Sequence, residues 1–223
     1  MWFKKSSYIG VSVKEGQYYP CPMVWWNKQA IKPPEKEFLT DRGRAILAVP
    51  MYEVFLSQTV SPPSSQSNLC TTTGPYQLNA SMVSTQLEKH RQALQTAGYR
   101  VLAMEPELLS LMRLVRYRYP MCQEYWLVDE SPFHRLLARW HNHQLTYACE
   151  GLNGAGGSPV WELFPEVLDI SSQSSTLFCT STSFLSWPTS LKECAQFLGG
   201  KEADSREQLI AWGAALWKHV SIG

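Results

Sequence analysis

The segment Ala97–Arg116, AGYRVLAMEPELLSLMRLVR, predicts a short strand that leads directly into a helix. Tyr99–Met104 is predominantly apolar, which favours a strand with little exposure to solvent. Glu105-Pro106-Glu107 is typical of a helix start. Proline has no backbone N–H, but an N–H in the first turn of a helix would have no partner within the helix, and glutamate suits the positive helix N-terminus. Three arginines follow near the predicted helix end, and Pro120 stops the helix. A strand that leads straight into a helix predicts an α/β protein.

The same alternation of strands and helices continues on both sides of this segment. Upstream, Ser81–Ala97 has apolar residues at helical spacing, and Gly98 stands where a left-handed residue ends a helix. Near the C-terminus, Ser205–Gln208 forms a capping box that starts a helix over 205–220. A further helix is predicted over Pro188–Leu198. The predicted strands are Tyr8–Val13, Tyr18–Trp26, Arg44–Val49, Glu53–Val60, one within Thr71–Ala80, Glu124–Asp129, His134–Trp140, Leu145–Cys149 and Leu177–Thr180.

The composition is that of a folded protein with little excess charge. Of its 223 residues, 44% are hydrophobic and 17% are charged, which excludes wholesale disorder. The net charge of +1 gives no electrostatic reason to expect nucleic acid or an anionic membrane as a direct partner. The six cysteines form no close pair, so we expect reduced, buried thiols. No signal peptide and no run of about 18 apolar residues is present, which predicts a cytoplasmic protein.

Five segments, taken in order, resemble the PilM family, the actin-like cytoplasmic component of type IV pilus machines. Ala97–Arg116 is the strongest of these resemblances, because the family has the same plan of a strand followed by a Leu-Leu-x-x-x-Arg helix. The others are the opening WFKKSSYIGVSV (2–13), RAILAVPMYEVFLSQTV (44–60), EYWLVDESPFHRLLARW (124–140) and EQLIAWGAALW (207–217).

This resemblance implies a two-lobed actin-like fold of the ribonuclease H type. Residues 1–120 would form the first lobe, with a reduced inserted subdomain around residues 50–80. Residues 121–223 would form the second lobe, and the helix over 205–220 would return to the first. The chain is similar in size to the reduced HofM-like and ComA-like relatives encoded with DNA-uptake pili. The polar segment Ser61–Ser67, SPPSSQS, is predicted to be a loop and stands where longer members carry a helix.

The resemblance also locates a degenerate nucleotide pocket. Actin-like proteins hold phosphates between two hairpins that carry glycines and aspartates. Here the vestigial pocket would consist of Ser12, Lys14, Asp129 and Ser131. Ser12 replaces the first aspartate, while Pro132 follows Ser131 in a turn that should offer amides. Phe184 occupies the expected adenine-contacting turn. We therefore expect no catalytic residue and no cofactor, with ATP and magnesium as the alternative.

Other residues could carry chemistry, but for each of them a structural role is the better explanation. His141 and His143 could share one face as a metal pair, but they lie in a predicted turn without a third ligand, so no metal is expected. Cys149 lacks a flanking motif for a nucleophile and is better explained as a buried thiol. The segment 151–158, GLNGAGGS, lacks the pattern of a phosphate-binding loop, so a flexible loop is favoured.

The resemblance implies a non-catalytic scaffold that binds the cytoplasmic N-terminal tail of a PilN-like inner-membrane protein. Pilus motor ATPases are further candidate partners, direct binding of nucleic acid is not expected, and the membrane would be reached only through the partner. The tail would add as a strand in a groove lined by Val49, Met51, Val54, Leu56 and Val60. Two alternatives remain open: a GspL-like cytoplasmic component of type II secretion, and an actin-like ATP-dependent kinase or ATPase.

Overall fold

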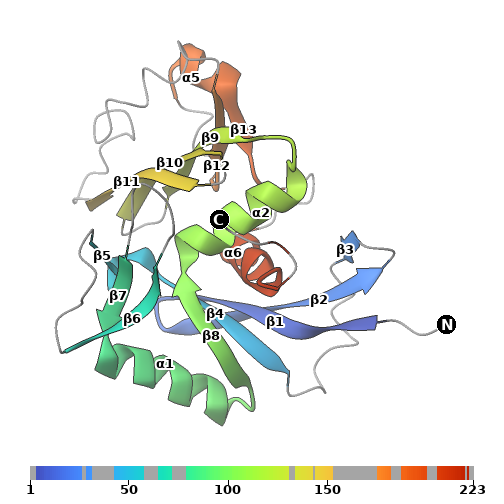
Figure 1. Cartoon of the computed structure of the whole chain (residues 1–223), viewed down its shortest axis with the longest axis vertical. Helices are drawn as coiled ribbons and strands as arrows, with labels where there is room; N and C mark the ends of the chain where they lie inside the picture. Colours follow the sequence, from blue (N-terminus) through green and yellow to red (C-terminus); the bar gives the residue numbers. More distant parts are fainter. Residues whose placement is uncertain are drawn as a thin grey trace. The chain divides into compact units, whose positions relative to one another are not determined.

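The chain divides into two compact units, which the computed structural model describes over residues 4–26, 29–31, 43–57, 65–71, 79–130, 134–142, 144–152, 175–181, 187–199, 205–218 and 220. Unit 1 comprises Met1–Thr71, Gln77–Leu114 and Glu207–Ser221. Unit 2 comprises Thr72–Tyr76, Val115–Arg206 and Ile222–Gly223. Figure 1 labels their helices and strands.

Unit 1 is built on a five-stranded sheet in the order β3-β2-β1-β4-β8. Its strands are β1 (Lys4–Lys14), β2 (Gln17–Trp26), β3 (Gln29–Ile31), β4 (Arg44–Val49) and β8 (Arg100–Pro106). The strands β1, β2 and β3 pair antiparallel, whereas β1, β4 and β8 are parallel. Glu15 and Gly16 close the β1–β2 hairpin with positive φ angles of 50° and 75°. The predicted strands over Tyr8–Val13, Tyr18–Trp26 and Arg44–Val49 are therefore confirmed.

A second, three-stranded antiparallel sheet lies between β4 and β8 in the chain. It has the order β5-β7-β6, formed by β5 (Phe55–Ser57), β7 (Asn79–Val83) and β6 (Gln66–Thr71). The short helix η2 (Met51–Glu53) precedes it, and α1 (Ser84–Thr96) follows.

Three predictions in this region were partly wrong. The strand predicted over Glu53–Val60 begins only at Phe55, because Glu53 belongs to η2, and 58–60 lie outside the described residues. The helix predicted from Ser81 begins only at Ser84, because residues 81–83 pair with β6 as part of β7. The loop predicted to reach Ser67 already contains the first two residues of β6, and 61–64 lie outside the described residues. Gly98, with a φ of 89°, follows α1 as predicted.

Helix α6 (Arg206–Ala215) packs against unit 1 at two glycines, with no room for a side chain. A Cβ on Gly10 of β1 would lie 1.7 Å from the carbonyl oxygen of Ala211. A Cβ on Gly213 would lie 1.9 Å from the carbonyl oxygen of Ser110 in helix α2 (Glu107–Arg118). Glycine is required at both positions because it alone allows backbone to approach backbone so closely. The helix start predicted at Glu105 falls at Glu107, since β8 continues through Pro106.

Unit 2 repeats the sheet of unit 1 in both strand order and strand direction. The order is β11-β10-β9-β12-β13, with β9, β10 and β11 antiparallel and β9, β12 and β13 parallel. These strands are β9 (Glu124–Glu130), β10 (His134–His141), β11 (Gln144–Leu152), β12 (Thr176–Cys179) and β13 (Ala195–Phe197). Helix α5 (Thr189–Cys194) is shorter than the predicted Pro188–Leu198, because residues 195–197 form β13.

Candidate functional site

A groove in unit 1 lies where each of its two sheets, as far as the described strands show, ends in an edge strand. It has a volume of about 220 Å³ and is lined by Leu69 of β6, Leu87 and Arg91 of α1, and residues Val101, Leu102, Ala103 and Met104 of β8. Among the described strands, β8 pairs only with β4, and β6 pairs only with β7. We call this feature the β6–β8 groove.

The lining of the β6–β8 groove suits an extended peptide. Six of its seven lining residues are apolar, and the four from β8 also present the backbone of that strand. Arg91 is the exception, and its nearest acid, Glu88, lies 3.3 Å away, with both side chains about half exposed. An exposed ion pair of this kind contributes little and leaves the guanidinium available. An edge strand offers backbone donors and acceptors, so a peptide can bind by adding a strand and placing alternate side chains on apolar surface.

A chain of three polar side chains fixes α1, and with it one wall of the groove. The Tyr18 hydroxyl lies 2.9 Å from Nδ1 of His90, and Nε2 of His90 lies 2.7 Å from Oε2 of Glu53. His90 is buried on α1, whereas Tyr18 belongs to β2 and Glu53 to η2. Burial raises the pKa of the Tyr18 hydroxyl, and the nearby Glu53 carboxylate adds to that shift. The chain therefore ties α1 to β2 and to η2.

The side chains predicted to line a partner groove lie mostly in the core. Val49 and Met51 have no exposed surface, Val54 is 7% exposed, and Leu56 is half-buried. Val60 lies outside the described residues. The prediction is wrong for Val49, Met51 and Val54, because their buried side chains cannot line a groove. The sequence pattern identified apolar residues but did not show that the strand edges of β6 and β8 carry the accessible ones.

At the first hairpin, the predicted pocket residues of unit 1 contact the start of α6. The buried Ser12 hydroxyl donates a hydrogen bond of 2.8 Å to the backbone carbonyl of Glu207. The Lys14 ammonium lies 3.4 Å from the Glu207 carboxylate. The Ser12 hydroxyl and the Lys14 ammonium, which could have faced a phosphate, therefore both bind Glu207 of the same unit.

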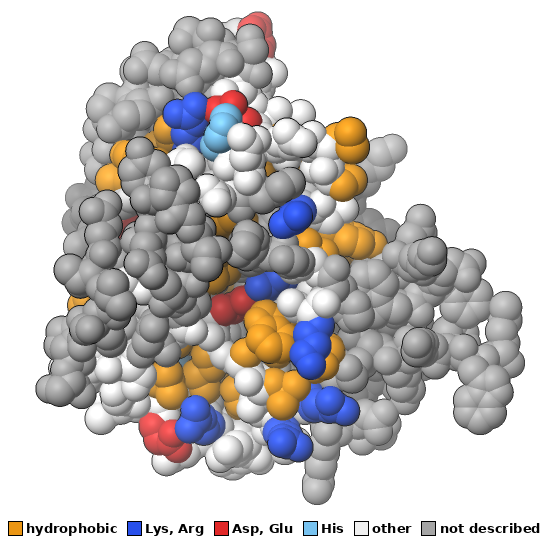
Figure 2. Space-filling view, viewed as in Figure 1, with side chains coloured by type: hydrophobic (Ala, Val, Ile, Leu, Met, Phe, Trp, Pro, Cys, Tyr) orange, Lys and Arg blue, Asp and Glu red, His pale blue; other side chains and the backbone are white. Residues whose placement is uncertain are grey.

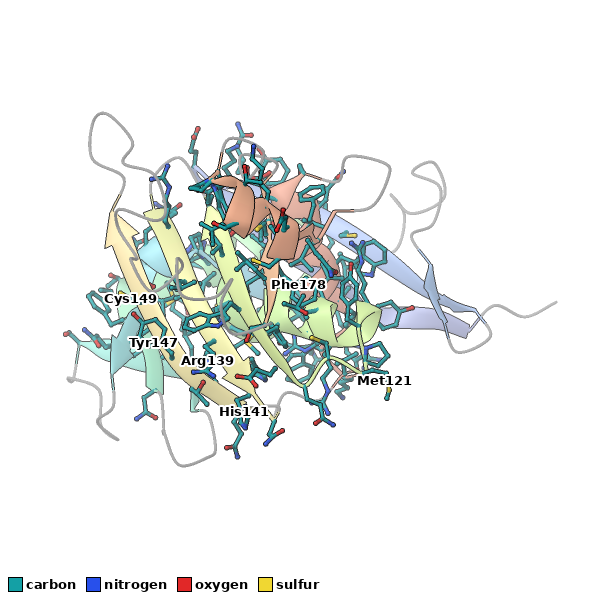
Figure 3. All side chains as sticks on the ribbon, turned by 90° about the horizontal axis from the view of Figure 1, so that it is seen from above. Met121, Arg139, His141, Tyr147, Cys149 and Phe178 are labelled. Carbon is teal, nitrogen blue, oxygen red and sulfur yellow. The ribbon has the colours of Figure 1, made fainter. Side chains whose placement is uncertain are left out.

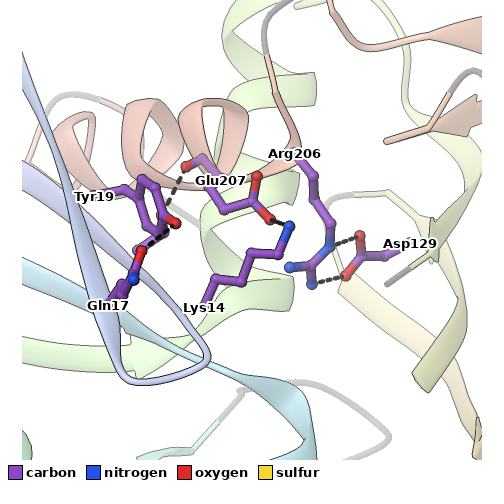
Figure 4. A network of polar contacts seen from close by, with 7 residues as sticks. Lys14, Gln17, Tyr19, Asp129, Arg206 and Glu207 are labelled. Carbon is purple, nitrogen blue, oxygen red and sulfur yellow. Dashed lines mark hydrogen bonds and ion pairs between the residues drawn. The ribbon is translucent and has the colours of Figure 1, made fainter. Parts of the chain in front are cut away.

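At the second hairpin, Asp129 is fully buried and held by Arg206 of the same unit (Figure 4). Nε and Nη2 of Arg206 donate to the two carboxylate oxygens at 2.7 and 2.6 Å. Thr180 donates a third hydrogen bond of 2.7 Å. A bidentate arginine neutralises the carboxylate and uses oxygens that a magnesium ion would need. Asp129 and Arg206, paired in this way, do not fit a bound metal–nucleotide. Ser131, the other predicted pocket residue of this hairpin, lies outside the described residues.

The carboxyl group of Glu130, next to Asp129 in the chain, is itself partly buried, and this changes its pKa. Desolvation raises the pKa of its carboxyl group, the charge of Asp129 raises it further, and Arg135 at 3.3 Å opposes the shift. Its amide donates to the Thr180 hydroxyl at 3.2 Å.

The remaining candidates form no recognisable site. His141 lies 3.3 Å from Glu124, whose pKa is lowered mainly by the hydrogen bond from Arg139. Figure 3 shows His141, Arg139 and Cys149 on neighbouring strands of unit 2, and Cys149 packs against an apolar core cluster. Within the described ranges, no group of three or more His, Cys, Asp or Glu residues is placed to hold a metal. His143, Phe184 and most of 151–158 lie outside those ranges.

Comparison with known proteins identifies the fold. No family model matches the sequence, and no curated protein matches it. Among solved structures, it is similar to a PilM–PilN type IV pilus biogenesis complex, with a TM-score of 0.60, 8% identity, and coverage of 95% of this chain and 98% of that one. It also resembles a Bacteroides thetaiotaomicron protein with an actin-like ATPase fold and unknown function, with a TM-score of 0.54, 7% identity, and coverage of 92% and 95%.

A third similar structure is the cytoplasmic domain of EpsL, an inner-membrane component of the Vibrio cholerae type II secretion system. The TM-score is 0.50 at 10% identity, over 96% of this chain and 99% of that one. The predicted actin-like, PilM-like fold is therefore confirmed, with its repeated sheet in units 1 and 2. In the described part of the chain, no helix combines the length and apolar content that crossing a membrane requires.

Proposed function

We propose that this protein is a non-catalytic scaffold of a type IV pilus machine that holds the cytoplasmic N-terminal tail of a PilN-like inner-membrane protein. The observation that carries the proposal is the β6–β8 groove, where two strands that end their sheets among the described strands flank mainly apolar residues. The tail would pair with one of these edges and place alternate side chains against Leu69 and Leu87. The likeness to a structure that contains both PilM and PilN supports this choice of partner.

The non-catalytic part of the proposal is supported by the two hairpins. Phosphoryl transfer in nucleotide-binding folds depends on free amides, a metal-binding carboxylate and a positioned water. Here Asp129 is bound on both oxygens by Arg206, and Ser12 is bound to Glu207. The protein would therefore act by holding its partner. It would work in the cytoplasm, reach the inner membrane through that partner and serve a DNA-uptake pilus, with motor ATPases as further partners.

Calorimetry of the full chain tests the proposal with two ligands. The first is a synthetic peptide of the N-terminal tail of the PilN-like protein encoded beside it, and the second is magnesium-ATP. We expect saturable peptide binding and no heat from magnesium-ATP. Leu87→Arg should abolish peptide binding, because it places a charge on the apolar wall of the groove. Gln92→Arg adds the same charge to an exposed position of α1 outside the groove lining and should bind normally.

Peptide binding that survives Leu87→Arg would place the site elsewhere, and absence of binding by the folded wild-type chain would refute the proposed partner. Measurable turnover of ATP by the pure protein would instead favour the actin-like kinase or ATPase function.

The likeness to the EpsL cytoplasmic domain favours a type II secretion role as the second candidate. The two roles differ in how the protein reaches the membrane. If it fractionates with membranes only when the PilN-like protein is present, the pilus scaffold is supported. Membrane association without that protein would favour the EpsL-like role.

A further inference from the structure

Three exposed basic side chains gather at one end of the unit 1 sheet. Arg44 begins β4, Arg100 begins β8, and Lys218 follows α6. All three are exposed, and none forms an ion pair within the described part of the chain. We call them the basic patch. Figure 2 shows basic side chains on the face of the molecule that also displays apolar side chains over unit 1.

The three charges lie close together. Arg44 and Arg100 are register partners on adjacent parallel strands, so their side chains leave the sheet on the same face, with backbones about 4.8 Å apart. Both Lys218 Nζ and Arg44 Cζ approach the ring of Tyr8, at 5.3 and 6.0 Å from its centre. The ring therefore brings the lysine to the arginine pair.

Structural roles account for only part of this arrangement. Lys218 lies just past the C-terminal end of α6, where a positive charge is favourable. The Tyr8 ring attracts cations, but such contacts are weak when they are exposed. Neither effect explains Arg100 beside Arg44, because like charges at paired positions of neighbouring strands repel each other. An anionic partner would turn that repulsion into attraction.

The basic patch lies next to the β6–β8 groove along β8, although the side chains of Arg100 and Val101 leave opposite faces of the sheet. Arg100 is the residue before Val101, the first β8 residue in the groove lining. An extended chain advances about 3.3 Å per residue, so a peptide paired along β8 would reach the patch within one or two residues of leaving the groove. Arg91 adds a further positive charge inside the groove itself.

We infer that the peptide held in the groove carries acidic side chains where it passes the start of β8, and that Arg44, Arg100 and Lys218 bind those carboxylates. This inference rests on the proposed function and specifies the chemistry of its partner. The apolar part of the peptide supplies contact with the groove, and the acidic part fixes its register along β8.

An acidic peptide suits the patch better than an anionic membrane. Membrane-binding surfaces combine several basic residues with aromatic rings that enter the headgroup region. Here Tyr8 is only 6% exposed and Trp217 is half-buried, with their ring centres 6.5 Å apart. These rings pack within unit 1 and are not presented for insertion.

Titration of the full chain with the PilN-like tail peptide at about 50, 150 and 500 mM salt tests this inference. The double variant Arg44→Gln/Arg100→Gln should bind about fivefold more weakly at the lowest salt, because it loses two exposed charge contacts. Its affinity should also depend less on salt. The control Lys89→Gln/Lys192→Gln removes the same charge from exposed positions outside the groove and patch, and should bind as the wild type does.

A peptide with its acidic residues changed to amides completes a double-mutant cycle. It should bind the wild type about fivefold more weakly and bind the double variant no worse than the native peptide does.

The outcomes separate this inference from the proposed function. If Leu87→Arg abolishes binding while salt and the arginine changes have no effect, the groove stands and the acidic contact is refuted. If the native tail binds in the groove but contains no acidic residue, the inference is also refuted. Binding of the wild type, but not of the arginine variant, to vesicles of anionic phospholipid without peptide would assign the patch to the membrane instead. Failure of all peptide binding would refute both proposals.

Discussion

Replacing Gly213 by alanine tests the close packing of α6 against α2, and two effects of opposite sign compete. In an exposed helix the change would stabilise the protein by about 1 kcal/mol, because glycine is a poor helix former. In this structure the new Cβ would lie 1.9 Å from the carbonyl oxygen of Ser110, whereas ordinary contacts begin at 3.4 Å. The helix would have to move away by about 1.5 Å, or the backbone of α2 would have to yield.

The steric effect should prevail. Overpacking a well-packed core usually costs about 1–3 kcal/mol, and the upper end applies because backbone atoms meet on one side and no rotamer change relieves the contact. Moving α6 would also weaken the packing of its buried residues, since a gap of even 0.5–1 Å forfeits about a quarter to a half of the dispersion energy. The carbonyl of Gly213 further accepts a hydrogen bond of 3.2 Å from Arg113. We expect a net loss of about 2 kcal/mol after subtracting the helix gain.

Urea unfolding followed by circular dichroism measures this difference. In thermal unfolding of a chain of this size, the same loss of about 2 kcal/mol would lower the melting temperature by about 4–8 °C. Gly16→Ala is a useful comparison, because Gly16 has a positive φ of 75° but no atom near its would-be Cβ. That variant should lose about 1 kcal/mol from backbone strain alone. If Gly213→Ala is more stable than the wild type, the reasoning is refuted and α6 does not pack as described.

Two further predictions concern buried polar groups. Glu105 and Arg113 form a buried ion pair at 2.5 Å. Glu105→Leu should therefore cost about 3–5 kcal/mol, because it leaves the buried charge of Arg113 without its ion-pair partner. In urea unfolding, Glu105→Leu/Arg113→Leu should cost less than the sum of the two single changes. Burial raises the pKa of the Tyr125 hydroxyl and the Cys179 thiol above their ordinary values of 10.0 and 9.0. Their stabilisation is complete below about pH 9 and is lost as the pH rises above the ordinary values of 9.0 and 10.0. The free energy of unfolding should therefore fall from about pH 9 upward, and Tyr125→Phe/Cys179→Ala should flatten that fall.

Elements with strong local signals could be predicted from the sequence. Arg44–Val49 is a continuous apolar run, and the structure places it as β4 with the same bounds. The hairpin of unit 2 was recognisable from two alternating strands around a polar turn. The five ordered resemblances led to the actin-like fold, which the structural comparisons confirm at only 7–10% identity.

Elements that depend on distant pairing could not be predicted. Residues 81–83 were assigned to α1 because Val83 fits helical spacing, but pairing with β6 makes them strand. Likewise, residues 195–197 continue the pattern of α5, yet they pair with β12 and form β13. Local propensity differs little between the two states at such short segments, so tertiary contacts decide. The β6–β8 groove was missed for the same reason, since no local pattern shows which strand edge is left unpaired.

The contacts at the two hairpins bear on how the proposed scaffold would respond to nucleotide. In unit 1, Glu207 accepts a hydrogen bond from Ser12 and forms an ion pair with Lys14. In unit 2, Arg206 forms an ion pair with Asp129. A ligand stabilises a protein only if it binds the folded state better than other states. A nucleotide would have to displace intrachain hydrogen bonds and a bidentate ion pair before making its own contacts. We therefore expect tail binding in the groove to have the same affinity with and without magnesium-ATP, and a nucleotide-dependent affinity would show that these hairpins still operate as a switch.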